Sequence, residues 1–270
     1  MTIPVDRLQT ASERDPWLRR GWLFGRVVLL LLSLLAAKVL VHRLHWEPLA
    51  PNPLFPALVA SEVFLMGFLL NGVLLDYKEG ERIPAELAAA LECLARETMS
   101  VRECHPDAEV TPALELLAAF SEDLLVWVGH AHPVAMLLDR LEALQLAVDR
   151  LGRCNPAPLQ ARLLLELANI RRAVHRIEVI RATIFVPSVY GMAYIGTGLL
   201  TVGLVLTDIE PFGESLFFIG VISFLLIKLL LLITDLDNPF AAGEAMSVEN
   251  VSLRPLGLAV ERLRLLAAAD

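Results

Sequence analysis

Five polar side chains interrupt stretches of this chain that are otherwise apolar enough to cross a lipid bilayer. They are Arg26, Lys38, Glu62, Asn71 and Lys228. An ionisable group inside lipid is costly, so such groups face protein or water. Arg26 and Lys38 lie near the ends of their stretches and can extend toward the membrane surface. Glu62 and Lys228 lie deeper, and two hypotheses stay open for them: a buried ion pair, Glu62 with Lys228 or Lys38, or a role in ion passage.

The stretch that contains Glu62 also has a regular face. Ala60, Phe64 and Phe68 are spaced four residues apart, and Asn71 continues their line. Small and aromatic residues on one line suit close helix packing. They suit equally a hydrophobic constriction that closes a pore by dewetting. Glu62 lies about 200° from Ala60 around the helix, so it points away from this line.

Apolar helices must carry these side chains across the membrane. The chain has 270 residues, is 56% hydrophobic and has a mean hydropathy of +0.59, which is too apolar for an ordinary soluble domain. A helical span needs about 20 apolar residues. Four stretches meet this need, in two pairs joined by short loops: residues 22–41, 54–75, 184–207 and 212–234.

Lysine and arginine predict the orientation of the spans, because they gather on the cytosolic side. Arginines precede the first span, precede the third and follow the fourth. The loop at residues 208–211 has none, and the loop at 42–53 has only Arg43. Both termini and the segment between the span pairs are therefore expected in the cytosol.

The segment between the pairs has apolar residues at helical spacing. The second span continues into it without a turn signal, as a charged helix reaching Glu97. Further helices are expected at 112–128, 133–151 and 158–181, with a loop from Trp127 to Pro133, where Gly129 and Pro133 interrupt the pattern. We predict an all-α fold, a four-span bundle with a cytosolic helical domain, divided at residues 1–21, 22–75, 76–183, 184–234 and 235–270.

Several functional classes are disfavoured by the sequence. The formal charge of −8 argues against a nucleic-acid partner, which requires a basic face. No nucleophile motif, phosphate loop or dinucleotide fingerprint occurs, so we expect no enzyme and no cofactor. The cysteines and histidines that could bind zinc lack a second ligand pair at zinc spacing, so we expect no metal site. These residues are Cys93, Cys104, Cys154, His105, His130 and His132.

Motifs at both ends of the apolar region resemble those of the bestrophin family of ion channels. Gly67-Phe68-Leu69-Leu70-Asn71 resembles the signature that ends the second span of bestrophins, and Glu79 and Leu94-Ala95-Arg96-Glu97 align with it without a gap. Val186-Pro187-Ser188-Val189-Tyr190 is similar to the family's entry into its third span. The acidic stretch and Pro-Phe after the fourth span are matched by residues 235–240. Leu69 stands where the family has arginine, and Ala241-Ala242 replaces the glycine after Pro-Phe.

The resemblance implies a homopentameric channel in a bacterial inner membrane. Its partners would be membrane lipid, other copies of the chain and inorganic ions, chloride among them, since animal relatives favour anions and bacterial ones can pass cations. It implies that the second spans line the pore, with a neck at Ala60, Phe64 and Phe68, and we expect Asn71, on the same line, to be a pore-lining residue as well. Animal relatives bind Ca²⁺ after the fourth span, where acids are sparser here. We therefore predict no metal site, with Asp235 and Asp237 as the alternative ligands. The alternative is a non-conducting membrane scaffold or sensor whose cytosolic helices bind a partner.

Overall fold

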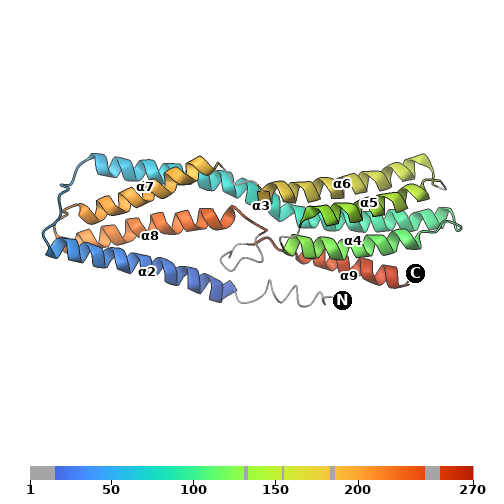
Figure 1. Cartoon of the computed structure of the whole chain (residues 1–270), viewed down its shortest axis with the longest axis horizontal. Helices are drawn as coiled ribbons and strands as arrows, with labels where there is room; N and C mark the ends of the chain where they lie inside the picture. Colours follow the sequence, from blue (N-terminus) through green and yellow to red (C-terminus); the bar gives the residue numbers. More distant parts are fainter. Residues whose placement is uncertain (1–15, 131–132, 154, 183–185, 241–249, 270) are drawn as a thin grey trace. The chain divides into compact units, whose positions relative to one another are not determined.

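The structure, a computed structural model, describes residues 16–130, 133–153, 155–182, 186–240 and 250–269. They form helices α2 to α9 and the segments between them (Figure 1). The described residues form no β-strand, and one isolated bridge joins Leu49 to Thr207. The predicted all-α class is therefore confirmed. The chain divides into two compact units, which we call the apolar unit (residues 15–76 and 184–237) and the polar unit (residues 77–183 and 238–270).

The apolar unit is built from long apolar helices. They are α2 (Pro16–Arg43), the first part of α3 (Leu54–Cys104), α7 (Pro187–Leu206) and α8 (Phe212–Leu236). Within the described residues, four helices are long and apolar enough to cross a membrane, as predicted. The described part of α7 begins at Pro187, a residue suited to the first turn because its missing N–H has no helical acceptor there.

Helix α3 is unbroken over 51 residues, from Leu54 to Cys104. The predicted charged extension of the second span is therefore confirmed, and it runs seven residues beyond Glu97. Pro84 lies inside the helix and is buried. Although proline removes one helical hydrogen bond, the surrounding residues remain helical.

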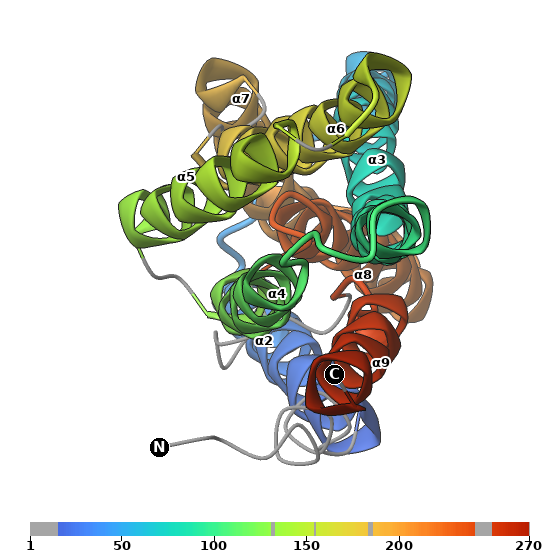
Figure 2. The same ribbon diagram turned by 90° about the vertical axis from the view of Figure 1, so that its right-hand side faces the viewer.

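The polar unit packs α4 (Thr111–Gly129), α5 (Val134–Leu151), α6 (Ala157–Ala182) and α9 (Arg254–Ala269) with the rest of α3. Figure 2 shows α9 beside α4. The sequence analysis predicts no helix in residues 235–270, so α9 is missed. Its apolar side chains do follow helical spacing, and three of them are at most 3% exposed in the core: Leu256, Val260 and Leu263.

A half-buried arginine caps the end of α4. The guanidinium of Arg181 donates to the carbonyl oxygens of Trp127 at 3.1 Å and Val128 at 2.5 Å. It also lies over the rings of Trp127 and Phe240, 4.7 and 5.7 Å from their centroids. The last carbonyls of a helix lack the N–H donors of a following turn. Trp127 O accepts from His130 N–H at 3.4 Å, and the Arg181 guanidinium gives both carbonyls a further donor, which favours continued helix. The predicted loop from Trp127 is therefore wrong at its start, since α4 runs to Gly129.

The Glu62 side chain of α3 packs directly against a glycine of α7. A Cβ atom added to Gly196 would lie within 3.0 Å of the carboxyl carbon and both oxygens of Glu62. Real Cβ atoms do not come so close, so only glycine fits beside this carboxyl group. Thr197, the next residue, donates its hydroxyl to Glu62 Oε1 at 3.2 Å.

A buried lysine fastens the end of α2. Lys38 is 0% exposed, and its ammonium donates to Glu47 Oε1 at 2.5 Å. It also donates to the carbonyl oxygens of Thr207 at 2.6 Å and Val205 at 3.3 Å. These carbonyls end α7, where the helix dipole favours a cation. Lys38 therefore ties α2 to the following loop and to α7 instead of extending to the membrane surface.

Glu47 connects this lysine to a histidine. Its Oε2 lies 3.0 Å from His42 Nδ1, and the His42 ring stacks on Phe212 with centroids 4.1 Å apart. Burial by itself would raise the pKa of Glu47, but the hydrogen bonds and charges of Lys38 and His42 outweigh it and lower the pKa below its ordinary value. A carboxyl group with a lowered folded pKa contributes stability above its unfolded pKa, and this is lost as the pH falls through the folded pKa. The clasp formed by Lys38, His42 and Glu47 is therefore intact at neutral pH.

We expect Glu47→Leu to destabilise the protein by about 3–5 kcal/mol, because it leaves the buried Lys38 ammonium without its counter-ion. The double variant Lys38→Met/Glu47→Leu should recover most of this loss, because it removes both charges. Thermal unfolding in detergent at pH 7 measures the effect, with the exposed carboxyl variant Glu210→Leu as the control. A double variant as unstable as Glu47→Leu alone would contradict the clasp.

We expect Gly196→Ala to destabilise the protein by about 1–3 kcal/mol, because the Glu62 side chain must leave its position. The matched control is Gly198→Ala on the same helix, where an added Cβ meets no atom within 4 Å. Melting temperatures of both variants provide the measurement. Equal melting temperatures would show that the contact between the Glu62 side chain and Gly196 is not rigid.

Candidate functional site

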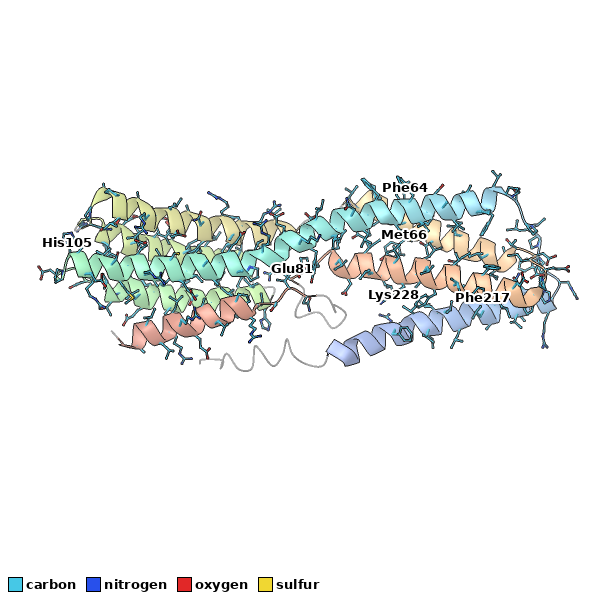
Figure 3. All side chains as sticks on the ribbon, turned by 180° about the vertical axis from the view of Figure 1, so that it is seen from behind. Phe64, Met66, Glu81, His105, Phe217 and Lys228 are labelled. Atoms are coloured by element: carbon cyan, nitrogen blue, oxygen red, sulfur yellow. The ribbon has the colours of Figure 1, made fainter. Side chains whose placement is uncertain are left out.

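The predicted line on α3 lies on an exposed side of the helix within one chain. Phe64 is 78% exposed and Phe68 is 59% exposed, and Ala60 and Asn71 are also exposed. The opposite side of α3 is packed, with Met66 at 0% exposure. Figure 3 shows Phe64 and Met66 on opposite sides of the helix. The four residues of the line therefore lie together, on a surface that the single chain does not cover.

An apolar pocket opens beside two of these residues. Its volume is about 520 Å³, and it is bordered by side chains of α3 and by one residue of α8. Ala60 and Phe64 form part of its wall, with Ile222 on the opposite helix. The pocket offers no ionisable group among its lining residues, so it suits apolar occupants. The lining residues are Phe55, Pro56, Val59, Ala60, Val63, Phe64 and Ile222.

Leu69, which departs from the family signature, lies on the packed side. It is 0% exposed and shares this side with Met66 and Val73, each also 0% exposed. An arginine at this position would bring a charge into an apolar core, which is costly without a counter-ion. The leucine therefore suits the packing of this chain. The exposed line still lies on the opposite side of α3, as the helical spacing predicts.

Glu62 belongs to the packed side and not to the exposed line. It is 7% exposed and accepts the hydrogen bond from Thr197. The hypothesis that Glu62 pairs with Lys38 or Lys228 is wrong for the single chain, because Lys38 binds Glu47 and Glu62 faces α7. Its contacts with Gly196 and Thr197 hold α3 from behind the exposed line.

Lys228 lies exposed on α8. It makes no ion pair within the part of the chain that the structure describes. Figure 3 shows it on the side of α8 next to α2. Its surroundings on α8 are apolar, with Leu225 59% and Val221 42% exposed.

The other predicted ligands do not gather into a metal site among the described residues, which include no group of three suitable side chains. Cys93 and Cys104 are free and exposed on α3. Cys154 and His132 lie outside the described residues. Asp235 and Asp237 lie at the end of α8, where each has an interaction with another group.

The remaining signature residues connect helices of the polar unit. Glu79 accepts two hydrogen bonds from Arg176 of α6, and Glu97 pairs with Arg162 of the same helix. The charge and hydrogen bonds of Arg176 lower the pKa of Glu79. These pairs are exposed for the most part, so each contributes little to stability. Their geometry indicates a part in aligning α6 along α3.

Sequence reasoning missed one acid, Glu47, and one glycine, Gly196. Glu47 lies in a loop, and no periodicity marks it. Gly196 lies in a run of small residues, Gly196-Thr197-Gly198, which is a signal for close helix approach in membranes. That signal marks a contact surface on α7, but it does not say which helix packs there. The structure shows that the Glu62 side chain of α3 does.

No protein-family model matches this chain, and no curated protein matches it. Solved structures do. A bacterial bestrophin homologue from Klebsiella pneumoniae, crystallised as a single-residue variant, has a TM-score of 0.72 and 15% sequence identity, covering 91% of this chain and 100% of its own. A second variant from Klebsiella pneumoniae has a TM-score of 0.72 and 16% identity, over 91% of this chain and 100% of its own.

A third crystal structure, described as a membrane protein, has a TM-score of 0.71 and 16% identity, over 91% of this chain and 99% of its own. Matches of this extent include both the apolar helices and the polar unit. The identity is low, so the similarity concerns the fold. The predicted resemblance is therefore confirmed at the level of architecture: the chain has a bestrophin-like fold.

Proposed function

We propose that this chain forms a bestrophin-like ion channel, in which α3 of each copy lines a central pore. The observation that carries the proposal is the exposed line of Ala60, Phe64, Phe68 and Asn71. Phenylalanine alone would suit lipid, but the Asn71 amide would lose its hydrogen bonds there at a cost of several kcal/mol. A water-filled pore accommodates both kinds of side chain.

One helix cannot enclose a pore, so the proposal requires several copies of the chain. The bestrophin resemblance implies five. The exposed phenylalanines of each copy would then form two stacked apolar rings at Phe64 and Phe68. An apolar ring narrow enough to exclude water blocks ions without any moving plug. Glu62 would act as a positioning residue, because it holds α3 from the packed side without reaching the ions.

The proposal includes an orientation and a location for the chain: both termini in the cytosol and the apolar helices in a bacterial inner membrane. Arginines cluster at the ends of the spans that join the polar segments, which favours cytosolic termini and a cytosolic polar unit. In a bacterial inner membrane the exposed Asn71 would then lie on the cytosolic side of the apolar rings. We propose that ions pass through the pore passively, since the sequence contains no motif for ATP binding or chemical catalysis.

Removing the rings should raise ion flux. We expect Phe64→Ala/Phe68→Ala to increase flux into liposomes, because a smaller apolar constriction wets more readily; a barrier lower by about 1.4 kcal/mol gives about tenfold faster flux. The matched control is Leu58→Ala, which shortens a side chain that is 58% exposed but lies about 200° from Ala60. Flux assays with reconstituted protein in matched amounts give the comparison.

Two outcomes would count against the pore assignment. Flux that is the same in the double variant, the control and the wild type would remove α3 from the conduction path. An assembled complex that passes no ion in any variant would favour the membrane scaffold.

The number of copies has its own test. We expect the detergent-solubilised complex to have five times the 29.8 kDa mass of one chain, because five copies are what the resemblance implies. Native mass spectrometry or light scattering corrected for detergent measures this mass. A monomeric mass in several mild detergents would contradict the proposal, since one chain leaves the Asn71 side of α3 uncovered.

A further inference from the structure

We propose that the exposed stripe of α7, formed by Ile195, Leu199 and Val202, docks into the apolar pocket beside Ala60 and Phe64 on the next copy of the chain. This inference rests on the proposed function, because it takes α3 to face a central pore. It names the two surfaces through which neighbouring copies meet. Three observations carry it: the exposure of the stripe, the depth of both surfaces, and the flanks of the chain on which they lie.

The α7 stripe is apolar and uncovered within one chain. Leu199 is 68%, Ile195 is 65% and Val202 is 56% exposed. They are three or four positions apart, so they lie on one side of the helix. Helix α7 contains no aspartate, glutamate, lysine or arginine, and the residues that line the pocket include none either. Pairing the two surfaces therefore buries no charge.

Two glycines show how α7 is aligned with α3. An added Cβ at Gly196 would meet the Glu62 carboxyl group, and one at Gly203 would lie 3.3 Å from Phe55 Cε2. A step of seven residues forward on α7 thus corresponds to seven residues backward on α3. The two helices are therefore antiparallel, and this register gives the level of every residue on one helix relative to the other.

The register puts the α7 stripe level with the pocket. Each residue of the stripe matches a residue of the pocket wall on α3: Ile195 with Val63, Leu199 with Val59, and Val202 with Pro56. Copies related by rotation about an axis normal to the membrane meet at equal depth. The stripe of one copy therefore comes to the level of its neighbour's pocket without any shift along the membrane normal.

Helical phase puts the pocket on one flank of α3. Viewed along α3 from its Leu54 end, the residues of a right-handed helix turn clockwise by about 100° each. Glu62 points at α7. Val63 therefore points about 100° clockwise from α7, and Val59 about 60° clockwise. Ile222 of α8 completes the pocket wall on this flank.

The α7 stripe lies on the opposite flank. In the same view α7 runs toward the observer, so its residues turn counterclockwise. Gly196 points back at α3. Ile195, one residue earlier, lies about 100° clockwise from this direction, and Leu199, three residues later, about 60° clockwise. Equal clockwise turns from opposite starting directions end on opposite flanks, so each chain carries the stripe on one flank and the pocket on the other.

This arrangement suits a closed ring with α3 toward its axis. Phe64 lies about 200° from Glu62 around α3, so when Phe64 faces the axis the two flanks face the neighbouring copies. Copies in a ring present unlike surfaces to each other, head to tail. The stripe of one copy then meets the pocket of the next, and close packing of such surfaces stabilises helix association in lipid.

Closure of the ring favours a second copy over lipid as the occupant. The pocket wall includes Ala60 and Phe64, which would border the pore. An acyl chain in the pocket would leave a lipid-filled gap beside the ion path. A docked neighbour closes this gap, as a water-filled pore requires.

Disulfide formation between single cysteines tests the docking. Two full-length chains with different tags, each with its three native cysteines replaced by serine, are co-expressed, one carrying Ile195→Cys and the other Val63→Cys. We expect oxidation of the detergent-solubilised complex to give a covalent heterodimer, because a disulfide needs Cα atoms within about 7 Å. The matched control pairs Ile195→Cys with Ser61→Cys. Ser61 is exposed and two residues from Val63, but it points to the flank without the pocket, so no heterodimer should form.

The mass of the complex separates failure of the docking from failure of the proposed function. A complex of several copies that gives no heterodimer with Ile195→Cys and Val63→Cys, or as much with Ser61→Cys, would overturn the docking and leave the pore proposal standing. A monomeric mass in several mild detergents would overturn both.

Two further variants identify the other occupants. A heterodimer of Val63→Cys with Leu32→Cys, at a position of α2 that is 59% exposed, in place of the one with Ile195→Cys would assign the pocket to α2 of the neighbour and overturn the docking of α7. Ile222→Trp fills the pocket. Loss of a retained phospholipid from an assembled Ile222→Trp complex, with no heterodimer from the first pair, would assign the pocket to an acyl chain instead.

Discussion

The packing of one face of α3 is the constraint on which the candidate site depends. In the apolar unit, the buried positions of α3 include Glu62, Met66, Leu69 and Val73. In the polar unit, they continue at helical spacing, all at most 3% exposed: Ile83, Leu87, Leu91, Leu94, Thr98 and Val101. These positions recur at three- and four-residue intervals, the period of an amphipathic helix that buries one stripe. The exposed line on the other side follows as a consequence.

Buried polar contacts fix this face more specifically than apolar packing alone. Apolar side chains tolerate sliding and rotation, because one hydrocarbon contact substitutes for another. The Glu62 carboxyl group has no such freedom, since it fits against Gly196 and accepts from Thr197. Lys38 similarly tolerates only one arrangement of the α2 end, the Glu47 loop and the carbonyls that end α7. Both groups specify which helices meet and at which level.

The sequence was sufficient to predict features that depend on composition and helical period. It was not sufficient to predict contacts that depend on which segment packs against a given side chain. Apolar length predicted the four spans, and the lack of a turn signal predicted the continuous α3. Helical phase correctly placed Glu62 away from Phe64. The partner of Glu62 was not predictable, because several helices could have faced it. Glu47 was missed because a loop carboxylate has no periodicity. The Gly129 signal matched the end of α4, but the loop was predicted to begin too early, at Trp127, because Arg181 and its contacts favour continued helix at Trp127 and Val128.

The two faces of α3 together limit how a neck at Phe64 and Phe68 could change state. Rotating α3 by one residue position, about 100°, would move Glu62 off Gly196 and toward the surface that now carries the phenylalanines. The Thr197 hydrogen bond would be lost, and Met66 and Leu69 would leave their packed positions. Such a step costs the burial of several large side chains, each about 1.5–3 kcal/mol. Rearrangement of the exposed Phe64 and Phe68 rings costs far less, because neither ring is packed within its own chain. Wetting and side-chain rotation therefore require less free energy than helix rotation as a way to open an apolar neck in this fold.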